Sequence, residues 1–168
     1  PIQLCLMTAQ IANGGYKIYP KIIVDEEKKD EPLDKFIPLF KNSKNIKIIQ
    51  DAMFGSTNEV MGTSYRSRIK DLKYQFAGKT GTAQVKKITE KDRELDLKTF
   101  EIPYEERDHA LYIAFGPYKN PRYALSVLVE HGGNGSTTAA PMAKKLFKLI
   151  IDRHPLRESI NKKKYMEI

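Results

Sequence analysis

The sequence predicts an α+β fold in which an antiparallel sheet packs against an N-terminal and a C-terminal helix. Two apolar runs, 110–116 and 123–130, are too short for helices, and turn residues separate them, so they predict a β-hairpin. A third run, 76–84, precedes the hairpin and completes a meander of three strands. Apolar residues recur at helical spacing near both ends of the chain, which predicts the two flanking helices.

The first helix is expected over 1–13, because Pro1 suits a first turn and the residues after Asn13 are glycines that can adopt positive φ. Its predicted core stripe is Ile2, Leu6, Ala9 and Asn13. The β-branched and aromatic residues of 16–24 predict a short strand at most, because Pro20 interrupts the run. Segment 25–45 is charged and contains prolines, so it predicts a surface excursion.

The middle of the chain predicts two helical pieces. The first runs from Ile46 to about Phe54 with Asn45 as its cap, and the second lies around 63–69. Segment 85–107 is dense in charged residues and has no periodic apolar pattern, so we expect a long mobile loop there.

A final helix is expected to start near Thr137 or Thr138, either of which can cap it, with Pro141 in its opening turn. Its predicted apolar stripe is Met142, Leu146, Phe147, Ile150 and Ile151, and its predicted water-facing residues are Lys144, Lys145 and Lys148. Residues 155–168 are highly charged and predict a frayed or disordered tail.

The bulk composition bounds the class of protein. A length of 168 residues suits a single domain. The sequence shows no targeting region and no membrane span, and its start at Pro1 indicates a chain cut from something longer. The single cysteine, Cys5, excludes an internal disulfide and predicts a buried inert thiol, which leaves the redox compartment open.

The formal net charge of +8 permits binding to nucleic acid or another polyanion. The charges are mixed in sign along the chain, and 162–164 is the one cluster without nearby acids. This distribution favours a solvated surface and makes a basic polyanion-binding module the weaker alternative.

The strand at 76–84 contains the triplet Lys79-Thr80-Gly81. A Lys-Thr-Gly triplet is one of three sequence signatures of penicillin-binding proteins and class A β-lactamases, together with S-x-x-K and S-D-N. The triplet alone is weak evidence, so the flanking sequence decides its meaning.

Four stretches, in order along the chain, make it resemble the penicillin-binding protein 2 family of class B peptidoglycan D,D-transpeptidases. They are 1–4 with 12–15, then 78–85, then 107–118, then 129–133. The resemblance implies that 1–154 is the C-terminal portion of a transpeptidase domain and supplies the last three strands of a five-stranded sheet. It also implies that a helical subdomain with the nucleophile lies upstream of Pro1.

Acyl transfer from a stem peptide needs a nucleophile, a base, an oxyanion hole and a cation that holds the terminal carboxylate. Lys79 provides the cation, and Gly81 leaves the backbone open to the substrate. Thr80 and Thr82 offer hydroxyls for the carboxylate. By resemblance, the backbone N–H of Thr82 is one oxyanion donor.

The other two signatures have only unsuitable matches. S-x-x-K occurs at Ser67 and at Ser159, and S-x-N occurs at Ser43 and at Ser56. The family places both motifs far upstream of Lys-Thr-Gly and in the order S-x-x-K, then S-x-N. We therefore expect the nucleophile and its base to be absent from this chain, which would be a fragment that is inactive alone.

The histidines predict neither a catalytic base nor a metal site. The family uses lysine as its base, so the resemblance gives His109 a structural role at the start of a strand. His131 and His154 lack carboxylates or thiols at ligand spacing, so we predict no metal, and nothing calls for a cofactor.

The alternatives within the enzyme class are a serine β-lactamase and a β-lactam-sensing domain. By resemblance, the parent protein would bind stem peptides or β-lactams and associate with proteins of the elongation complex. It would be anchored to the bacterial inner membrane through a missing N-terminal segment and face the periplasm.

Overall fold

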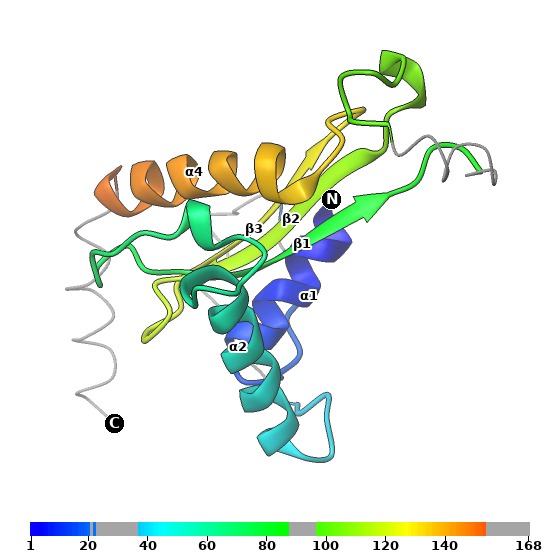
Figure 1. Cartoon of the computed structure of the whole chain (residues 1–168). Helices are drawn as coiled ribbons and strands as arrows, with labels where there is room; N and C mark the ends of the chain where they lie inside the picture. The colour runs from blue at the N-terminus through cyan, green and yellow to red at the C-terminus, as the bar shows by residue number, and fades with distance from the viewer. Residues whose placement is uncertain (21, 23–36, 88–96, 154–168) are drawn as a thin grey trace, which may run out of the picture.

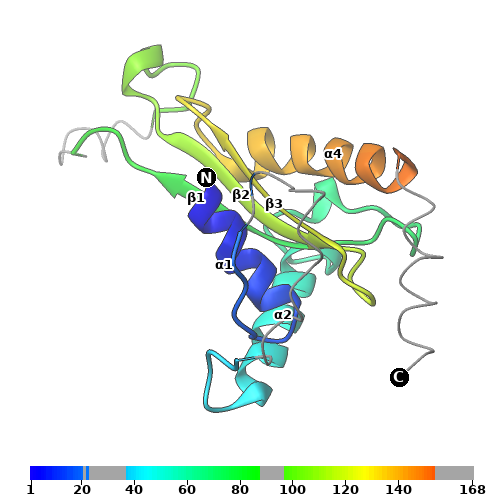
Figure 2. The ribbon, with the colours of Figure 1, turned by 180° about the vertical axis from the view of Figure 1, so that it is seen from behind.

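A three-stranded antiparallel sheet separates two layers of helices in the computed structural model, which describes residues 1–20, 22, 37–87 and 97–153 (Figure 1). The strands are β1 (Ala77–Ala83), β2 (His109–Gly116) and β3 (Tyr123–Val129), in the order β1-β2-β3. Helices α1 (Ile2–Ala12) and α2 (Ser43–Asn58) lie on one side, and α4 (Ala140–Arg153) lies on the other (Figure 2). The predicted α+β meander between terminal helices is confirmed.

The register of the sheet places β2 at its centre. Gly81 of β1 lies opposite Leu111 of β2, and Ile113 of β2 lies opposite Ser126 of β3. Because successive side chains of a strand point to opposite faces, alternate residues of β2 enter the two layers. Tyr112 and Ala114 belong to the core under α4, whereas Phe115 joins Met53 of α2 in the core on the other face.

Helix α1 is confirmed, and the glycines after it, Gly14 and Gly15, have φ values of 93° and 91°. Its predicted core stripe is partly wrong, because Ile2 is 53% exposed and the buried residue of α1 is Thr8. The Thr8 hydroxyl donates to Leu4 O at 2.7 Å, so its burial leaves no unpaired polar group. Because a carbonyl of the same helix accepts the hydrogen bond of the Thr8 hydroxyl, Thr8 can face the core.

Segment 16–24 forms no strand within its described residues, where Tyr16 makes an isolated bridge to Pro38. Helix α2 begins earlier and ends later than predicted, since it spans Ser43–Asn58. Its cap is Asn42 rather than Asn45, with the Asn42 side chain accepting from Lys44 N at 2.9 Å. The low helix propensity of Gly55 predicts an interruption, but α2 continues through this residue because it packs against β1.

The second helical piece, predicted around 63–69, is only the 3₁₀ turn η1 (Tyr65–Ser67). Within its described residues, the long segment before β2 contains the 3₁₀ turn η2 (Tyr104–Glu106), which the charge pattern did not predict. We expected a long mobile loop over 85–107, and part of that segment, 88–96, lies outside the described residues, as does the predicted tail 155–168.

The last helix starts differently from the prediction. Asn134, not Thr137 or Thr138, caps the π-helical turn η3 (Gly135–Ala139), which leads directly into α4. The buried face of α4 contains Phe147 and Ile151 as predicted, together with Ala140 and Ala143. Met142 and Leu146 are 47% and 41% exposed, because the two small alanines occupy the face that approaches the sheet.

Two smaller expectations concern Cys5 and membrane spans. Cys5 is half-buried rather than buried, and its thiol donates to Ala124 O at 3.5 Å. Within the described residues, no helix has the length and the apolar character that crossing a membrane requires.

Candidate active site

Strand β1 presents the Lys-Thr-Gly triplet at an open edge of the sheet. Among the described residues β1 pairs with β2 alone, so its other edge carries no strand. The strand is buried at Ala77 and Gly78 and becomes exposed at Lys79 and Thr82. Lys and Gly are poor strand formers, so pairing with the apolar β2 holds this sequence in an extended conformation.

Hydrogen bonds around the start of β1 show which way its backbone groups point. Gln75 O accepts from Tyr118 N, which follows β2, at 2.7 Å. On the opposite side, Phe76 O accepts from the Asn58 side chain at 2.9 Å, and Gly78 O faces the Thr57 hydroxyl at 3.4 Å. Even-numbered residues therefore direct their backbone groups away from β2.

In an antiparallel strand the N–H and C=O of one residue point to the same side, and the side alternates along the chain. The backbone groups of Thr80 and Thr82 consequently face the open edge, whereas those of Lys79 and Gly81 face β2. An N–H at Thr82 is thus directed toward the space in which a ligand along this edge would lie.

Polar side chains gather around Thr80. Lys79 Nζ donates to Thr80 O at 3.0 Å and to Thr80 Oγ1 at 3.2 Å. Thr63 Oγ1 lies 3.4 Å from Thr80 Oγ1, and Ser56 Oγ lies 3.2 Å from Thr63 Oγ1. The ammonium group and three hydroxyls form a continuous polar surface beside the open edge, which suits an anionic ligand.

Tyr112 lies behind this polar surface and contacts the segments that carry it. Its hydroxyl lies 2.9 Å from both Thr57 Oγ1 of α2 and Ser64 Oγ, which precedes η1. The side chain is fully buried, and burial raises the pKa of the Tyr112 phenol, which keeps it protonated and able to donate. One hydroxyl therefore fixes α2 and the segment before η1 against the sheet.

Two glycines of β1 differ in the space around them. A Cβ at Gly78 would lie 2.4 Å from the Tyr112 hydroxyl oxygen, so the tyrosine occupies the place of a side chain. At Gly81 the nearest atom to such a Cβ would be Leu111 Cβ at 3.3 Å. Gly78 is thus required by packing, whereas Gly81 leaves the strand open next to the candidate ligand position.

The matches to the other two motifs have structural surroundings. Ser67 is 3% exposed in η1, and Lys70 follows in a stretch that is not helical. The Asn58 side chain bonds Phe54 O and Phe76 O, and Ser56 bonds Thr63. Ser43 is the first residue of α2, and Ser159 lies outside the described residues.

His109 and His131 pair with each other at the far end of β2. His131 N donates to His109 Nδ1 at 2.9 Å, and the ring centroids are 4.8 Å apart. His131 Nδ1 lies 3.1 Å from Arg107 O, and its φ of 54° marks a tight turn. Both rings thus tie together the chain before β2 and after β3, the kind of structural role expected for His109.

Among the described residues, no cluster of three or more His, Cys, Asp or Glu side chains has an arrangement suited to a metal ion. The sequence reasoning overlooked Thr63, Tyr112 and Arg66, whose positions beside β1 depend on tertiary contacts. The signal in the sequence was the cluster of hydroxyl residues Thr63, Ser64, Tyr65 and Ser67 around Arg66.

An open strand edge with Lys-Thr-Gly, backed by a meander and a closing helix, is the arrangement that the resemblance to penicillin-binding transpeptidases implies. The family model described as penicillin binding protein transpeptidase domain matches residues 1–148, so the chain belongs to this family.

Curated relatives of this chain are peptidoglycan D,D-transpeptidases MrdA. The protein from Salmonella typhimurium is 32% identical over 161 residues, which cover 90% of this chain and 25% of the relative. The protein from Haemophilus influenzae is 36% identical over 110 residues, which cover 65% of this chain and 16% of the relative. The chain thus spans about a quarter or less of the length of these relatives.

Solved structures of penicillin-binding protein 2 have the same fold. The Pseudomonas aeruginosa protein in complex with WCK 5153 has a TM-score of 0.67 and 31% identity, over 92% of this chain and 31% of that one. The Helicobacter pylori protein in complex with MreC has a TM-score of 0.70 and 28% identity, over 93% of this chain and 25% of that one.

Proposed function

We propose that the chain forms the Lys-Thr-Gly wall of the active site of a peptidoglycan D,D-transpeptidase that cross-links stem peptides and is acylated by β-lactams. The observation that supports this most directly is the open edge of β1, where the Thr80 and Thr82 backbone faces outward beside Lys79. Membership of the transpeptidase family and the MrdA relatives support the same reaction.

The roles of the four residues follow from their positions. Lys79 and the hydroxyls of Thr80 and Thr82 hold the terminal carboxylate of the peptide or of the β-lactam. The Thr82 N–H stabilises the oxyanion that develops when the scissile carbonyl is attacked. Gly81 allows the substrate to approach the backbone. The nucleophilic serine and its base are supplied by a part of the protein outside this chain.

The proposal extends to the setting of the complete protein. The Helicobacter pylori relative was solved in complex with MreC, and we propose that this protein likewise associates with cell-wall elongation proteins. Cell-wall synthesis by the MrdA relatives also supports a location on the periplasmic side of the inner membrane. Similarity to transpeptidases over 90% of the chain disfavours the polyanion-binding module.

Labelled penicillin tests the function in the complete protein. Lys79→Met is expected to lower the rate of covalent labelling by roughly a hundredfold, because it removes the charge that positions the carboxylate. Lys119→Met, in the exposed connection between β2 and β3, is the matched control and should label normally. Equal labelling of both variants contradicts the role of Lys79.

The alternatives give different results in the same assay. A transpeptidase keeps its acyl group for a long time, whereas a serine β-lactamase releases it rapidly and turns over. The 168-residue chain alone is expected to remain unlabelled. Labelling of the chain alone would show that it contains a nucleophile, and Ser67 would then be the first residue to replace.

A further inference from the structure

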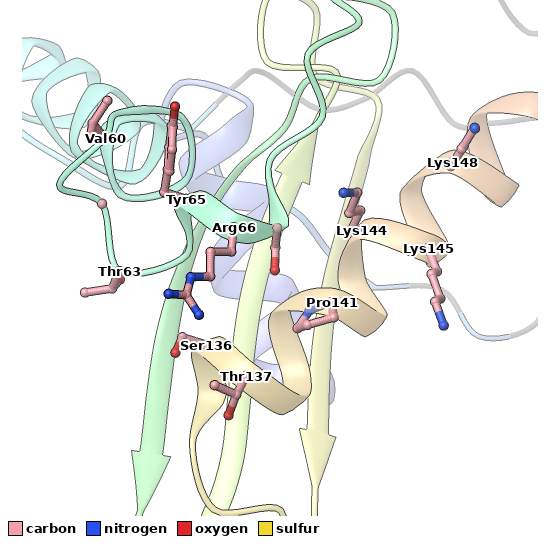
Figure 3. Close-up of a pocket in the computed structure, with 12 residues that line it drawn as sticks. Val60, Thr63, Tyr65, Arg66, Ser136, Thr137, Pro141, Lys144, Lys145 and Lys148 are labelled. Carbon is pink, nitrogen blue, oxygen red and sulfur yellow. The ribbon is translucent and has the colours of Figure 1, made fainter.

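Thr63 brings a further hydroxyl group to the open edge of β1. It lies in the segment between α2 and η1 and lines a cleft together with residues such as Tyr65 and Ser136 (Figure 3). Its Oγ1 is 3.4 Å from Thr80 Oγ1 and 3.2 Å from Ser56 Oγ. Thr63 thus connects the last turn of α2 to the hydroxyl that we assign to the substrate carboxylate.

The backbone on both sides of Thr63 is held against α2. A Cβ at Gly62 would lie 2.4 Å from Ser56 O and 2.5 Å from Gly55 O, so this close approach requires a glycine. Ser64 is 1% exposed, and its N–H and its hydroxyl each donate to Ser56 O at 3.0 Å. The Thr63 side chain is exposed, but the chain that carries it is fixed beside β1.

The hydrogen bonds of Thr80 decide what its hydroxyl offers to a ligand. A threonine hydroxyl has one proton to donate and two lone pairs that accept. Lys79 Nζ, which only donates, uses one lone pair of Thr80 Oγ1 at 3.2 Å. If Thr80 donates to Thr63, its proton is not available for a carboxylate. If Thr63 donates to Thr80, both lone pairs are occupied and the Thr80 proton is free for the ligand.

An anionic ligand favours the second arrangement, because a carboxylate accepts hydrogen bonds and donates none. Ser56 supports the same direction, since a proton donated from Ser56 Oγ to Thr63 Oγ1 leaves the Thr63 proton for Thr80. The three hydroxyls then form a chain of donors that ends at the ligand. Hydrogen bonds in such a chain polarise one another, which strengthens the last one.

We propose that Thr63 is a positioning residue of the carboxylate site: it donates to Thr80 and thereby directs the Thr80 proton toward the terminal carboxylate of the peptide or the β-lactam. This inference rests on the proposed function, because it assumes that Thr80 binds that carboxylate. It gives Thr63 an effect on the affinity for the ligand and no direct part in the attack on the scissile carbonyl.

Acylation kinetics of the complete protein with labelled penicillin separate these two effects. The dissociation constant of the initial complex reports the binding of the carboxylate, and the rate constant of acylation reports the chemical step. Thr63→Val removes the hydroxyl and keeps the shape of the side chain. It is expected to raise the dissociation constant about fivefold, with a nearly unchanged rate constant of acylation. Ser56→Ala should act in the same direction with a smaller effect.

Two variants show whether the hydroxyl itself is responsible. Thr63→Ser retains the hydroxyl and is expected to bind penicillin normally. Thr137→Val is the matched control, because it also removes an exposed threonine hydroxyl, one that donates to Asn134 O at 3.3 Å. A normal dissociation constant for Thr63→Val overturns the inference. A loss of affinity in Thr63→Ser as large as that in Thr63→Val overturns it as well.

A double-mutant cycle tests whether Thr63 acts through Thr80. In a protein that carries Thr80→Val, the second substitution Thr63→Val is expected to change the dissociation constant no further. A second loss of the same size in that background would mean that Thr63 acts independently of Thr80, and the inference is then wrong.

Failure of this inference and failure of the proposed function give different results. If Lys79→Met and Thr80→Val weaken the initial complex with penicillin while Thr63→Val does not, the transpeptidase proposal stands and Thr63 has no positioning role. If the wild-type protein is not acylated, the proposed function is wrong and the inference falls with it.

Discussion

The hydroxyl of Tyr112 joins three segments behind the candidate site: β2, the end of α2 and the chain before η1. The two hydroxyls that it contacts, Thr57 Oγ1 and Ser64 Oγ, also have other hydrogen-bond partners. Thr57 Oγ1 also lies within 3.4 Å of Met53 O and Gly78 O, and Ser64 Oγ donates to Ser56 O at 3.0 Å. Loss of the phenol oxygen should therefore weaken the cluster without leaving a partner unsatisfied.

Tyr112→Phe is expected to lower the free energy of unfolding by about 1 kcal/mol, the usual contribution of one buried hydrogen bond. Urea denaturation of the chain measures this change. Tyr19→Phe is the matched control, because Tyr19 is 68% exposed and should have almost no effect. Equal effects of the two substitutions would show that the Tyr112 hydroxyl does not hold the segments together.

Gly78→Ala and Gly81→Ala separate packing from access to the site. At Gly78 the new methyl group meets the Tyr112 hydroxyl at 2.4 Å, and overpacking of this kind costs about 1–3 kcal/mol. At Gly81 the nearest atom is 3.3 Å away, so the fold is retained while the methyl group narrows the approach to the backbone.

The expected results are a lower Tm for Gly78→Ala, and slower penicillin labelling with a nearly unchanged Tm for Gly81→Ala. Thermal unfolding and labelling of the complete protein test both. Normal labelling of a folded Gly81→Ala protein would contradict the proposed closeness of substrate and backbone at this position.

Helix α2 is tied to the connection between β2 and β3 by a polar contact at its outer side. Asp51 accepts from Lys47 Nζ at 2.8 Å and from the Tyr118 hydroxyl. The hydrogen bond from Lys47, followed by that from Tyr118, lowers the pKa of Asp51 below its usual value. Burial raises the pKa of Tyr118, which keeps its hydroxyl protonated as the donor.

A carboxyl group whose pKa is lowered in the folded state stabilises the fold above its unfolded pKa, and this contribution is lost as the pH falls through the folded pKa. Asp51→Asn should therefore cause a small decrease in Tm at pH 7, and a smaller decrease at an acidic pH below the usual pKa of an aspartic acid. The contact is exposed, so added salt should shrink the difference.

Thermal unfolding at the two pH values, with Glu105→Gln as the control on an exposed acid, measures the effect of Asp51→Asn. A difference that is the same at both pH values would mean that the Asp51 charge does not contribute. The prediction then fails even if the variant is less stable.

Sequence patterns predicted the helices and strands well where the spacing of apolar residues and the positions of turn residues indicated the same boundaries. The hairpin of β2 and β3 is an example, because two apolar runs flank residues that favour turns. The start of α4 was missed, because Asn134 caps a π-helical turn through its side-chain contact to Ser136 N at 2.8 Å, and nearby threonines looked equally suitable. The α4 stripe was half wrong, because close approach to the sheet favours alanine over larger residues.

In the candidate site, too, the residues of a local sequence motif were predicted, whereas those positioned by tertiary contacts were not. Lys79 to Thr82 were predicted from a local motif, whereas Thr63 reaches this edge only through the path of the chain around β1. No spacing along the sequence encodes that path, because contacts between Thr63 and Thr80 arise from the packing of α2 and η1 against the sheet.

Across the whole molecule, β2 is covered on both faces and paired on both edges, whereas the outer edge of β1 has no strand partner among the described residues. Amide hydrogen exchange reports such differences, because protection follows hydrogen bonding and burial. We expect the β2 amides to exchange slowest, and the β1 amides to alternate along the strand.

The alternation is the sharpest test of the site geometry. Lys79 and Gly81 point their N–H groups toward β2 and should be protected, whereas those of Thr80 and Thr82 face the open edge and should exchange faster. NMR exchange rates for single residues measure the pattern in the chain, and in the complete protein a bound β-lactam should slow exchange at Thr82 most. Uniform protection from Lys79 to Thr82 would show that the strand edge is covered, and a Thr82 N–H engaged in that way is unable to stabilise an oxyanion.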